Sequence, residues 1–433
     1  MSGPLTGVRI IDFTGVMMGP YATQMLADYG AEVIKIESPD GDSMRHAGPT
    51  RSPGMGPMYL HANHNKKSVA IDLKQPRGKE VLLQLLQDAH VFVSNVRPSA
   101  LARLGFGYEE LAQRFPRLIY VSGCGFGSNG RYAGRPAYDD LIQGLAALPT
   151  LALRAGTEEP VYTPSVIADR VTGLHVALAI TSALYSQQQS GRGQYVEVPM
   201  FECLAHLVLG DHFGGRTHQP PTGPMGYSRL LTPNRRPYRT EDGYVCVVVY
   251  TDQHWKAFLT LIGQAALLES DPRFASPAAR FQNIDQLYAI VAEAMLTKTS
   301  AEWLEVLAKA DIPAGPLHSP ESLLDDPHLN DAGFFEVLEH PTEGTIYRMR
   351  TPTRWSETAP EYRSPAPRLG EHSRSVLQEA GVARSLLDTL ERDGVIKTAP
   401  VSNHAADRSQ LVEAPSQVIE SAGVTARVAA SIG

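Results

Sequence analysis

Cysteine is scarce in this chain of 433 residues, which has only Cys124, Cys203 and Cys246. The three lie far apart and form no CxxC pair. They can supply neither a disulfide framework nor a zinc site built from cysteines. We therefore expect reduced thiols in a cytoplasmic protein.

Long apolar runs and an excess of positive charge are lacking as well. No run reaches the ~18 apolar residues of a membrane span, and residues 1–7 lack the basic and apolar regions of a signal peptide. A net charge of −7 and a pI near 6.1 argue against a nucleic-acid-binding surface spread over the whole protein. We predict a soluble protein with no membrane or nucleic-acid partner. Hydrophobic residues, at 43%, still suffice for a sizeable core.

Several catalytic motifs are also missing. The chain contains no GxSxG and no Walker A sequence, which disfavours an α/β-hydrolase serine and a P-loop. His61 and His64 have no HExxH motif or carboxylate cluster beside them, so we predict no metal site. Residues 125–130 fit GxGxxG, but residues 131–136 separate them from the next helical pattern. This spacing favours a loop near a ligand over a dinucleotide site.

Strand and helix patterns alternate through the first ~150 residues, as in α/β domains. The first unit is a strand at 8–13, a helix at 20–29 and a strand at 32–37, which is a βαβ motif. Further strands are predicted at 66–73, 91–94, 118–122 and 195–198, and further helices at 76–87, 99–114, 138–147 and 174–188. This alternation predicts a doubly wound α/β sheet.

The character of the sequence changes after residue 213, where Gly, Pro and Arg become frequent. The predicted division is a large domain over 1–213, a linker over 214–243, a smaller α+β domain over 244–350, a return linker over 351–367, a C-terminal part of the large domain over 368–395, and a weakly ordered tail over 396–433. A length of 433 residues agrees with two or three domains.

Asp169 ends a short apolar run and lies before the helical pattern that starts at Leu174. One interpretation is a helix N-cap, in which the carboxylate accepts a hydrogen bond from a free backbone N–H. The other is a nucleophile for covalent catalysis. The local sequence does not decide between them.

Basic residues gather in the α/β half, at Lys66, Lys67, Lys74, Arg97 and Arg103. Such side chains are usually solvated. Several lie at predicted strand or helix ends, where α/β domains bind ligands, so a phosphate-bearing ligand is a second interpretation.

Eight stretches carry a likeness to a known family. They are residues 12–37, 65–80, 95–111, 116–130, 135–144, 168–173, 190–202 and 366–373. In this order they resemble the class III (CaiB/BaiF-type) coenzyme A transferases, the family of formyl-CoA:oxalate CoA-transferase. The likeness extends over about residues 4–392.

The resemblance implies a large Rossmann-like, CoA-binding domain, a small domain and two interlocked subunits in a homodimer. It implies two substrates, a CoA thioester (an acyl-CoA) and a free carboxylic acid, and no permanently bound cofactor. Asp169 would be the nucleophile, forming an anhydride and then an aspartyl-CoA thioester, without ATP or a metal.

The resemblance also implies a set of CoA-binding residues. They are Val16, Met17, Ser38, Ile71, Lys74, Asn95, Val96, Arg97, Arg103 and Tyr138. Met17 replaces a Gln of the formyl-CoA members, and Ser38 replaces an Arg near the adenine. Since Met17 cannot donate a hydrogen bond to an oxyanion, we expect an acid larger and less polar than oxalate, with succinyl-CoA as a candidate donor.

Two alternatives belong to other classes. The α-methylacyl-CoA racemases of the same fold use a His–Asp pair, whose His is replaced here by Tyr138, and a tyrosine has too high a pKa to be that base. A CoA-binding protein without transfer activity would use Asp169 only as a helix cap.

Overall fold

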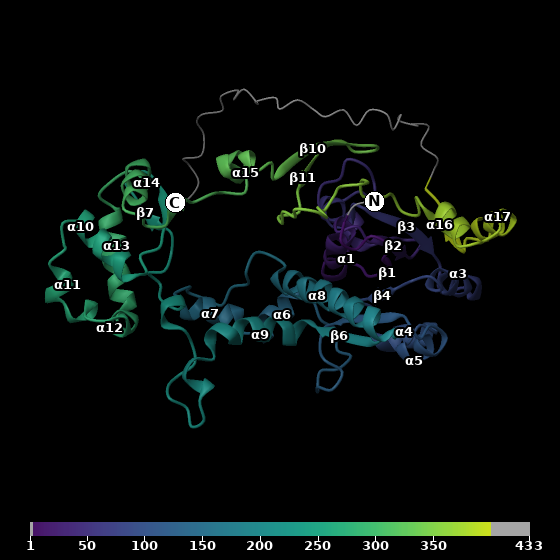
Figure 1. Cartoon of the computed structure of the whole chain (residues 1–433), viewed down its shortest axis with the longest axis horizontal. Helices are drawn as coiled ribbons and strands as arrows, with labels where there is room; N and C mark the ends of the chain where they lie inside the picture. The colour runs from purple at the N-terminus through teal and green to yellow at the C-terminus, as the bar shows by residue number, and fades with distance from the viewer. Residues whose placement is uncertain (1–2, 400–433) are drawn as a thin grey trace. The chain divides into compact units, whose positions relative to one another are not determined.

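The computed structural model describes residues 3–399 and has a seven-stranded central sheet (Figure 1). Its strands are β1 (Arg9–Phe13), β2 (Glu32–Glu37), β3 (Lys66–Ile71), β4 (Val91–Ser94), β5 (Ile119–Cys124), β6 (Tyr195–Pro199) and β12 (Ile396–Lys397). Their order is β12-β3-β2-β1-β4-β5-β6, and only β12 runs antiparallel. The predicted mixed α/β fold with a mostly parallel sheet is confirmed, and β1 to β6 have the 3-2-1-4-5-6 order of a doubly wound sheet.

Helices cover both faces of this sheet. They are α1 (Met18–Asp28), α2 (Pro57–Asn63), α3 (Pro76–Leu86), α4 (Pro98–Leu104), α5 (Tyr108–Arg114), α6 (Asp139–Leu145), α7 (Leu148–Arg154), α8 (Ile167–Ser190), α9 (Met200–His212), α16 (Ser373–Glu379) and α17 (Arg384–Arg392). Ile10 packs with α1 and α8, whereas Ile11 packs with α3, α16 and α17 on the opposite face. Both side chains are fully buried, which explains why the strand sequences are almost continuously apolar.

Several helices differ from the prediction. The helix expected over 99–114 is split into α4 and α5, because Gly105 has a φ of +86° and ends α4 in a left-handed cap. The segment 38–65, between the predicted strands at 32–37 and 66–73, contains α2, which begins at Pro57, and a 3₁₀ turn at Ser43–His46. A proline suits the first turn of a helix because its missing N–H is not needed there.

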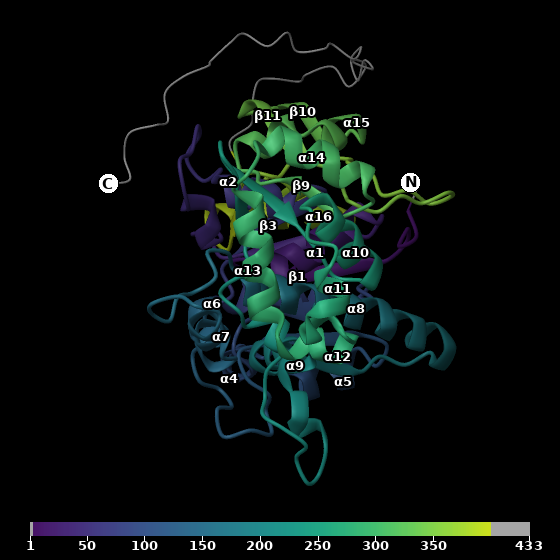
Figure 2. The same ribbon diagram turned by 90° about the vertical axis from the view of Figure 1, so that its left-hand side faces the viewer.

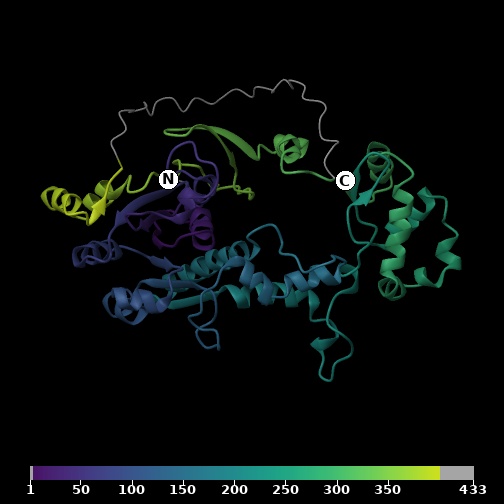
Figure 3. The same cartoon turned by 180° about the vertical axis from the view of Figure 1, so that it is seen from behind.

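A second hydrophobic core lies in residues 238–316. It joins the antiparallel strands β7 (Tyr238–Arg239), β8 (Tyr244–Val247) and β9 (Ala314–Pro316) to α10 (Asp252–Leu261), α11 (Leu267–Ser270), α13 (Ile284–Met295) and α14 (Ser300–Lys309). Helix α12 (Pro277–Gln282) contacts α13, and several of these helices lie side by side in Figure 2. Trp255 and Trp303 are its largest buried side chains. The remaining elements are α15 (Pro327–Asp331) and the hairpin of β10 (Phe335–His340) and β11 (Gly344–Met349), green in Figure 3.

The C-terminal residues of the described range belong to the large sheet. Ile396 pairs with Ile71 and Lys397 with Ala70, so β12 extends the edge at β3. Two residues of the predicted tail therefore form a strand, because Ile396 is buried against the core. Residues 400–433 of that tail lie outside the described residues.

Helix α8 is long and apolar enough to meet a composition test for a membrane span, with a mean hydropathy of 1.2 over its most apolar window. One of its faces, however, packs on the sheet through Val176, Ile180 and Ala183. This burial is what the core helix of an α/β domain requires.

Candidate active site

A cavity of about 580 Å³ lies at the carboxyl end of the parallel strands. The chain leaves β1 and β4 toward opposite sides of the sheet, and ligands of doubly wound folds bind at such a switch point. The turn after β1 supplies Gly15, Val16 and Met18, and the segment after β4 supplies Asn95, Val96 and Arg97. The wall is completed by residues that follow β5 and by Asp169.

Helix α8 brings Asp169 to this cavity. The helix begins at Ile167, seven residues earlier than the pattern from Leu174 suggested, so Asp169 lies within its first turn. Val166 is the N-cap, and the cap has no side-chain hydrogen bond. The N-cap interpretation of Asp169 is therefore wrong. The backbone N–H of Asp169 donates instead to the Asp139 carboxylate, at 3.0 Å.

Close packing of α8 on α1 sets the surroundings of the Asp169 carboxylate. A Cβ at Gly173 would lie 2.8 Å from the carbonyl oxygen of Met18 and 2.9 Å from the Tyr21 ring, so only glycine allows this approach. The backbone N–H of Met18, at the N-terminus of α1, faces this carboxylate and lowers its pKa. Free N–H groups at a helix N-terminus favour negative charge.

The pKa of Asp169 is raised to about 6. Burial is the largest cause, and repulsion from the Asp139 carboxylate adds to it, while Arg170 and the Met18 N–H act in the opposite direction. The carboxylate is therefore ionised at neutral pH but more basic than an ordinary aspartate, which suits a nucleophile.

Replacing Asp139 with asparagine should move the pH dependence of any reaction that needs ionised Asp169. Asp139 is 7% exposed, and its second oxygen accepts a bond from Gln143 at 2.6 Å. An asparagine keeps one acceptor oxygen for the Asp169 N–H but removes the repulsion, so the acid limb of kcat should fall from about pH 6 by roughly one unit. The measurement is kcat from pH 4.5 to 8.

Asp140→Asn is the matched control, since Asp140 follows on the same helix but is exposed. It should leave the limb in place. An unchanged limb in Asp139→Asn would show that Asp139 does not set the pKa of Asp169.

Half of the residues predicted to bind CoA line this cavity together with Asp169. They are Val16, Asn95, Val96, Arg97 and Tyr138, the last with a side chain 74% exposed. Met17 is 2% exposed and is the N-cap of α1, and the cavity wall has Met18 in its place. A one-residue shift of this kind depends on the path of the turn and is not visible in the sequence.

The other predicted residues lie outside this wall. Ser38 and Lys74 are exposed just beyond the ends of β2 and β3, and Ile71 is buried at the end of β3. These positions share the carboxyl edge of the sheet with the cavity. Arg103 is exposed on α4.

Two of the basic residues considered for phosphate are ion-paired instead. The Lys66 side chain is fully buried, and its Nζ lies 3.1 Å from the Asp12 carboxylate. The Lys67 ammonium binds Glu32 at 2.7 Å. A phosphate role for Lys66 is therefore wrong, because the sequence does not show that this lysine points into the core.

Sequence reasoning missed the part of the wall that follows β5. These residues include Cys124, Phe126, Arg135, Ala137, Glu197 and Met200. The rule that ligands lie beyond strand ends could have found the first two. Burial raises the pKa of the Cys124 thiol to about 12, so this cysteine is protonated and does not compete with Asp169 as a nucleophile.

The GxGxxG stretch is the loop that its spacing predicted. No helix begins before α6 at Asp139. A Cβ at Gly125 would lie 2.3 Å from that of Ala137, and the N–H of Gly127 donates to Glu202 at 2.9 Å. Glycine here serves close packing of the cavity wall.

Comparison with known proteins agrees with this geometry. The sequence profile of CoA-transferase family III matches residues 5–373. A formyl-CoA:oxalate CoA-transferase of Bradyrhizobium diazoefficiens is 32% identical, with 94% of this chain and all of the relative covered. A succinate–glutarate CoA-transferase of Agrobacterium fabrum is also 32% identical, covering 90% of this chain and 97% of the relative.

Solved structures show the same fold. A CAIB/BAIF family protein from Brucella suis superposes with a TM-score of 0.74 at 30% identity, covering 88% of this chain and all of the other. A protein from Mycobacterium tuberculosis gives a TM-score of 0.74 at 31% identity, covering 86% and 99%. With a matching profile over most of its length, this chain belongs to CoA-transferase family III and is an enzyme of that class.

Proposed function

We propose that this enzyme moves CoA from an acyl-CoA to a free carboxylic acid, with Asp169 as the covalent nucleophile. The observation that carries the proposal is a carboxylate with a pKa of about 6 in the wall of the cavity at the switch point. Its setting combines partial burial with a backbone N–H donor, which a nucleophilic carboxylate needs in order to stay ionised and reactive.

The reaction follows as a series of acyl exchanges. The Asp169 carboxylate attacks the thioester carbonyl, and the C–S bond breaks. CoA thiolate departs, and Asp169 then carries the acyl group as a mixed anhydride. The thiolate attacks the aspartyl carbonyl and releases the donor acid, so that Asp169 becomes an aspartyl-CoA thioester. The acceptor carboxylate displaces CoA to form a second anhydride, and the thiolate takes the new acyl group, which frees Asp169. Each anhydride retains the energy of the thioester.

The cavity wall supports CoA as the occupant. Val16 and the segment 95–97 offer backbone and polar groups, and Arg97 and Arg135 are exposed cations near its mouth. Guanidinium groups bind phosphates well. We place the adenine end along the same edge of the sheet, toward Ser38, Ile71 and Lys74, with Arg103 as a further phosphate ligand. Reduced thiols and CoA substrates agree with a cytoplasmic enzyme.

The side chains near Asp169 favour an acceptor with an apolar body. Met18, Phe126, Ala137 and Met200 form this part of the wall. These side chains cannot donate hydrogen bonds to the second carboxylate of an acid as small as oxalate. We therefore propose an acid larger than oxalate, with succinyl-CoA as a donor to test first.

A transfer assay tests the proposal. Purified enzyme is incubated with succinyl-CoA or acetyl-CoA and a panel of free acids, and acyl-CoA products are measured by mass spectrometry. New acyl-CoA species support transfer and identify the acceptor. Solvent deuterium entering next to the thioester, without transfer, would support racemase chemistry. Binding of CoA thioesters with neither reaction would indicate a binding protein.

We also propose that the enzyme is a homodimer with interlocked subunits. Leu174, Leu178 and Tyr185 on α8 are 51%, 63% and 65% exposed, and their spacing places them along one side of the helix. An apolar stripe of this kind on a core helix marks an interaction surface.

A charge on the stripe should disrupt the dimer. Leu178→Lys is expected to reduce the dimer fraction that forms when the chains refold at low micromolar concentration, as measured by analytical ultracentrifugation, because a desolvated lysine opposes association. Leu386→Lys on α17, where the leucine is 45% exposed, is the control and should leave the mass unchanged. A dimer that tolerates Leu178→Lys would argue against this interface.

A further inference from the structure

The turn between β1 and α1 is held by buried and half-buried side chains from several elements. The Asn95 amide accepts from the Gly15 N–H at 3.0 Å and donates to the Gly15 carbonyl at 2.7 Å. The Lys35 ammonium donates to the Thr14 carbonyl at 2.7 Å, and Asp12 accepts from the Thr14 N–H at 3.0 Å. This turn leads to Met18, whose N–H faces Asp169.

Val16 has an unusual conformation in this turn, with a φ of +66°. A β-branched residue rarely adopts the left-handed region, because its side chain crowds the backbone. Such a conformation persists only where neighbouring groups enforce it, and it is common at functional sites.

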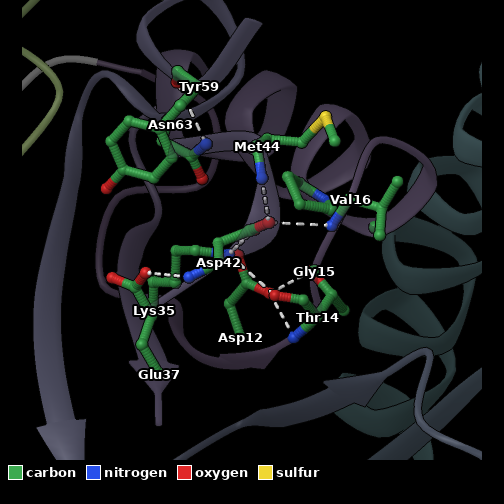
Figure 4. A network of polar contacts seen from close by, with 12 residues as sticks. Asp12, Thr14, Gly15, Val16, Lys35, Glu37, Asp42, Met44, Tyr59 and Asn63 are labelled. Carbon is green, nitrogen blue, oxygen red and sulfur yellow. Dashed lines mark hydrogen bonds and ion pairs between the residues drawn. The ribbon is translucent and has the colours of Figure 1, made fainter. Parts of the chain in front are cut away.

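The Asp42 side chain binds the backbone of Val16 (Figure 4). One of its oxygens accepts from the Val16 N–H at 3.1 Å and from the Met44 N–H at 3.0 Å. Its other oxygen binds the Lys35 ammonium at 2.9 Å. The side chains of Lys35 and Asp42 are 0% and 2% exposed, so neither can turn toward solvent. The Lys35 ammonium thus connects the Asp42 carboxylate to the Thr14 carbonyl of the same turn.

The conformation of Val16 sets the direction of the chain that enters α1. Met17 is the N-cap and Met18 the first helical residue. If Val16 relaxed to a negative φ, the N–H of Met18 would no longer point at Asp169. Gly19 shows how close this packing is, since a Cβ there would lie 2.3 Å from Thr14.

We propose that Asp42, held by Lys35, is a positioning residue that keeps Val16 in the left-handed conformation and so directs the N-terminus of α1 at the nucleophile. This rests on the proposed role of Asp169. Neither side chain of the pair lines the cavity, so each acts through the turn.

The test compares two variants without a lone buried charge. Lys35→Met with Asp42→Asn keeps an oxygen for the Val16 N–H, whereas Lys35→Met with Asp42→Ala removes it. The Asn variant should retain most of kcat. The Ala variant should lose roughly 100-fold in kcat, as a misplaced catalytic group does, with a smaller change in KM for the acyl-CoA.

The pH profile separates positioning from general loss of structure. Asp169 faces Asp139, Arg170 and the Met18 N–H, and only the last changes in the Ala variant. Its acid limb should therefore move above pH 6. Asp28→Asn, which disturbs the buried pair with His64 at the other end of α1, should lower Tm but leave the limb in place.

Adding Val16→Gly to the Ala variant tests whether the conformation of Val16 causes the loss of kcat, because glycine adopts a positive φ without steric cost. The triple variant should fold and regain at least roughly tenfold in kcat, as recovery of one misplaced group allows. Equal kcat and equal acid limbs in the Asn and Ala variants would overturn the proposal, as would a triple variant that does not fold or shows no gain. Absence of transfer by the natural enzyme would instead overturn the proposed function.

Discussion

Asp169→Asn should abolish CoA transfer, with kcat reduced by at least ~10³-fold, as loss of a covalent nucleophile requires. The amide has nearly the shape of the carboxylate and keeps an oxygen that can face the Met18 N–H, so the cavity should keep its form. It cannot form an anhydride. The measurement is acyl-CoA product formation by mass spectrometry, with acyl-CoA binding measured separately by calorimetry.

Acyl-CoA binding should survive in this variant within a few fold, because Asp169 is only one of many residues in the wall. Residual transfer above one percent of the natural rate would exclude Asp169 as the covalent nucleophile. Loss of both binding and transfer would indicate a collapsed cavity, which urea unfolding of the same variant detects.

The same substitution should stabilise the protein at neutral pH. The folded-state pKa of Asp169, about 6, lies above its ordinary value of 3.8, so ionisation of this group weakens the folded state as pH rises between these values. The free energy of unfolding in urea at pH 7.5 should therefore increase by roughly 1–3 kcal/mol in Asp169→Asn. Well below pH 3.8 the difference should vanish, since both states are then protonated. Equal stability at pH 7.5 would contradict the assigned pKa.

Asp12→Ala should produce the second large effect, a loss of about 3–5 kcal/mol in the free energy of unfolding. Asp12 is 0% exposed and lies 3.1 Å from the buried Lys66 ammonium. Burial alone would raise the pKa of Asp12, but Lys66 and Lys35 together lower it, so the carboxylate is charged. Without it, Lys66 remains buried next to the Thr23 and Asn63 side chains with no counter-ion at this contact. The measurement is urea unfolding at pH 7.

Removing both charges should be far less harmful than removing one. Asp12→Leu with Lys66→Met replaces the pair with apolar groups, a change that is often nearly neutral in buried sites. Glu305→Ala breaks the exposed pair with Lys309 and should leave stability unchanged. A small loss in Asp12→Ala, comparable to that of the double variant, would show that Lys66 finds another partner or loses its proton.

Much of the fold could be predicted because it depends on local patterns. The strand at 32–37 and the helix beginning at Pro76 each have a period or a cap that is visible in a few residues. The helix start at Ile167 could not be predicted, because the apolar run before Leu174 has no N-cap side chain and fits a strand equally well.

The site could be predicted only in part for the same reason. Family resemblance predicts Val16 and the segment 95–97, which line the cavity at strand ends, where ligands of such sheets bind. Met18, Cys124 and Met200 were missed, since an apolar side chain in a cavity wall resembles one in the core. Lys66 was misread because its partners Asp12 and Pro20 are far away in sequence.

The sequence by itself determined the alternation of strands and helices, the apolar strands that two covered faces require, and the family motif around Asp169. Only the tertiary structure decided the pKa of Asp169, the burial of Lys66 and the conformation of Val16. The reason is physical. Each of these depends on charges, donors and packing supplied by distant segments, such as Asp139 for Asp169 and Asp42 for Val16, which come together only when the sheet and its helices have packed.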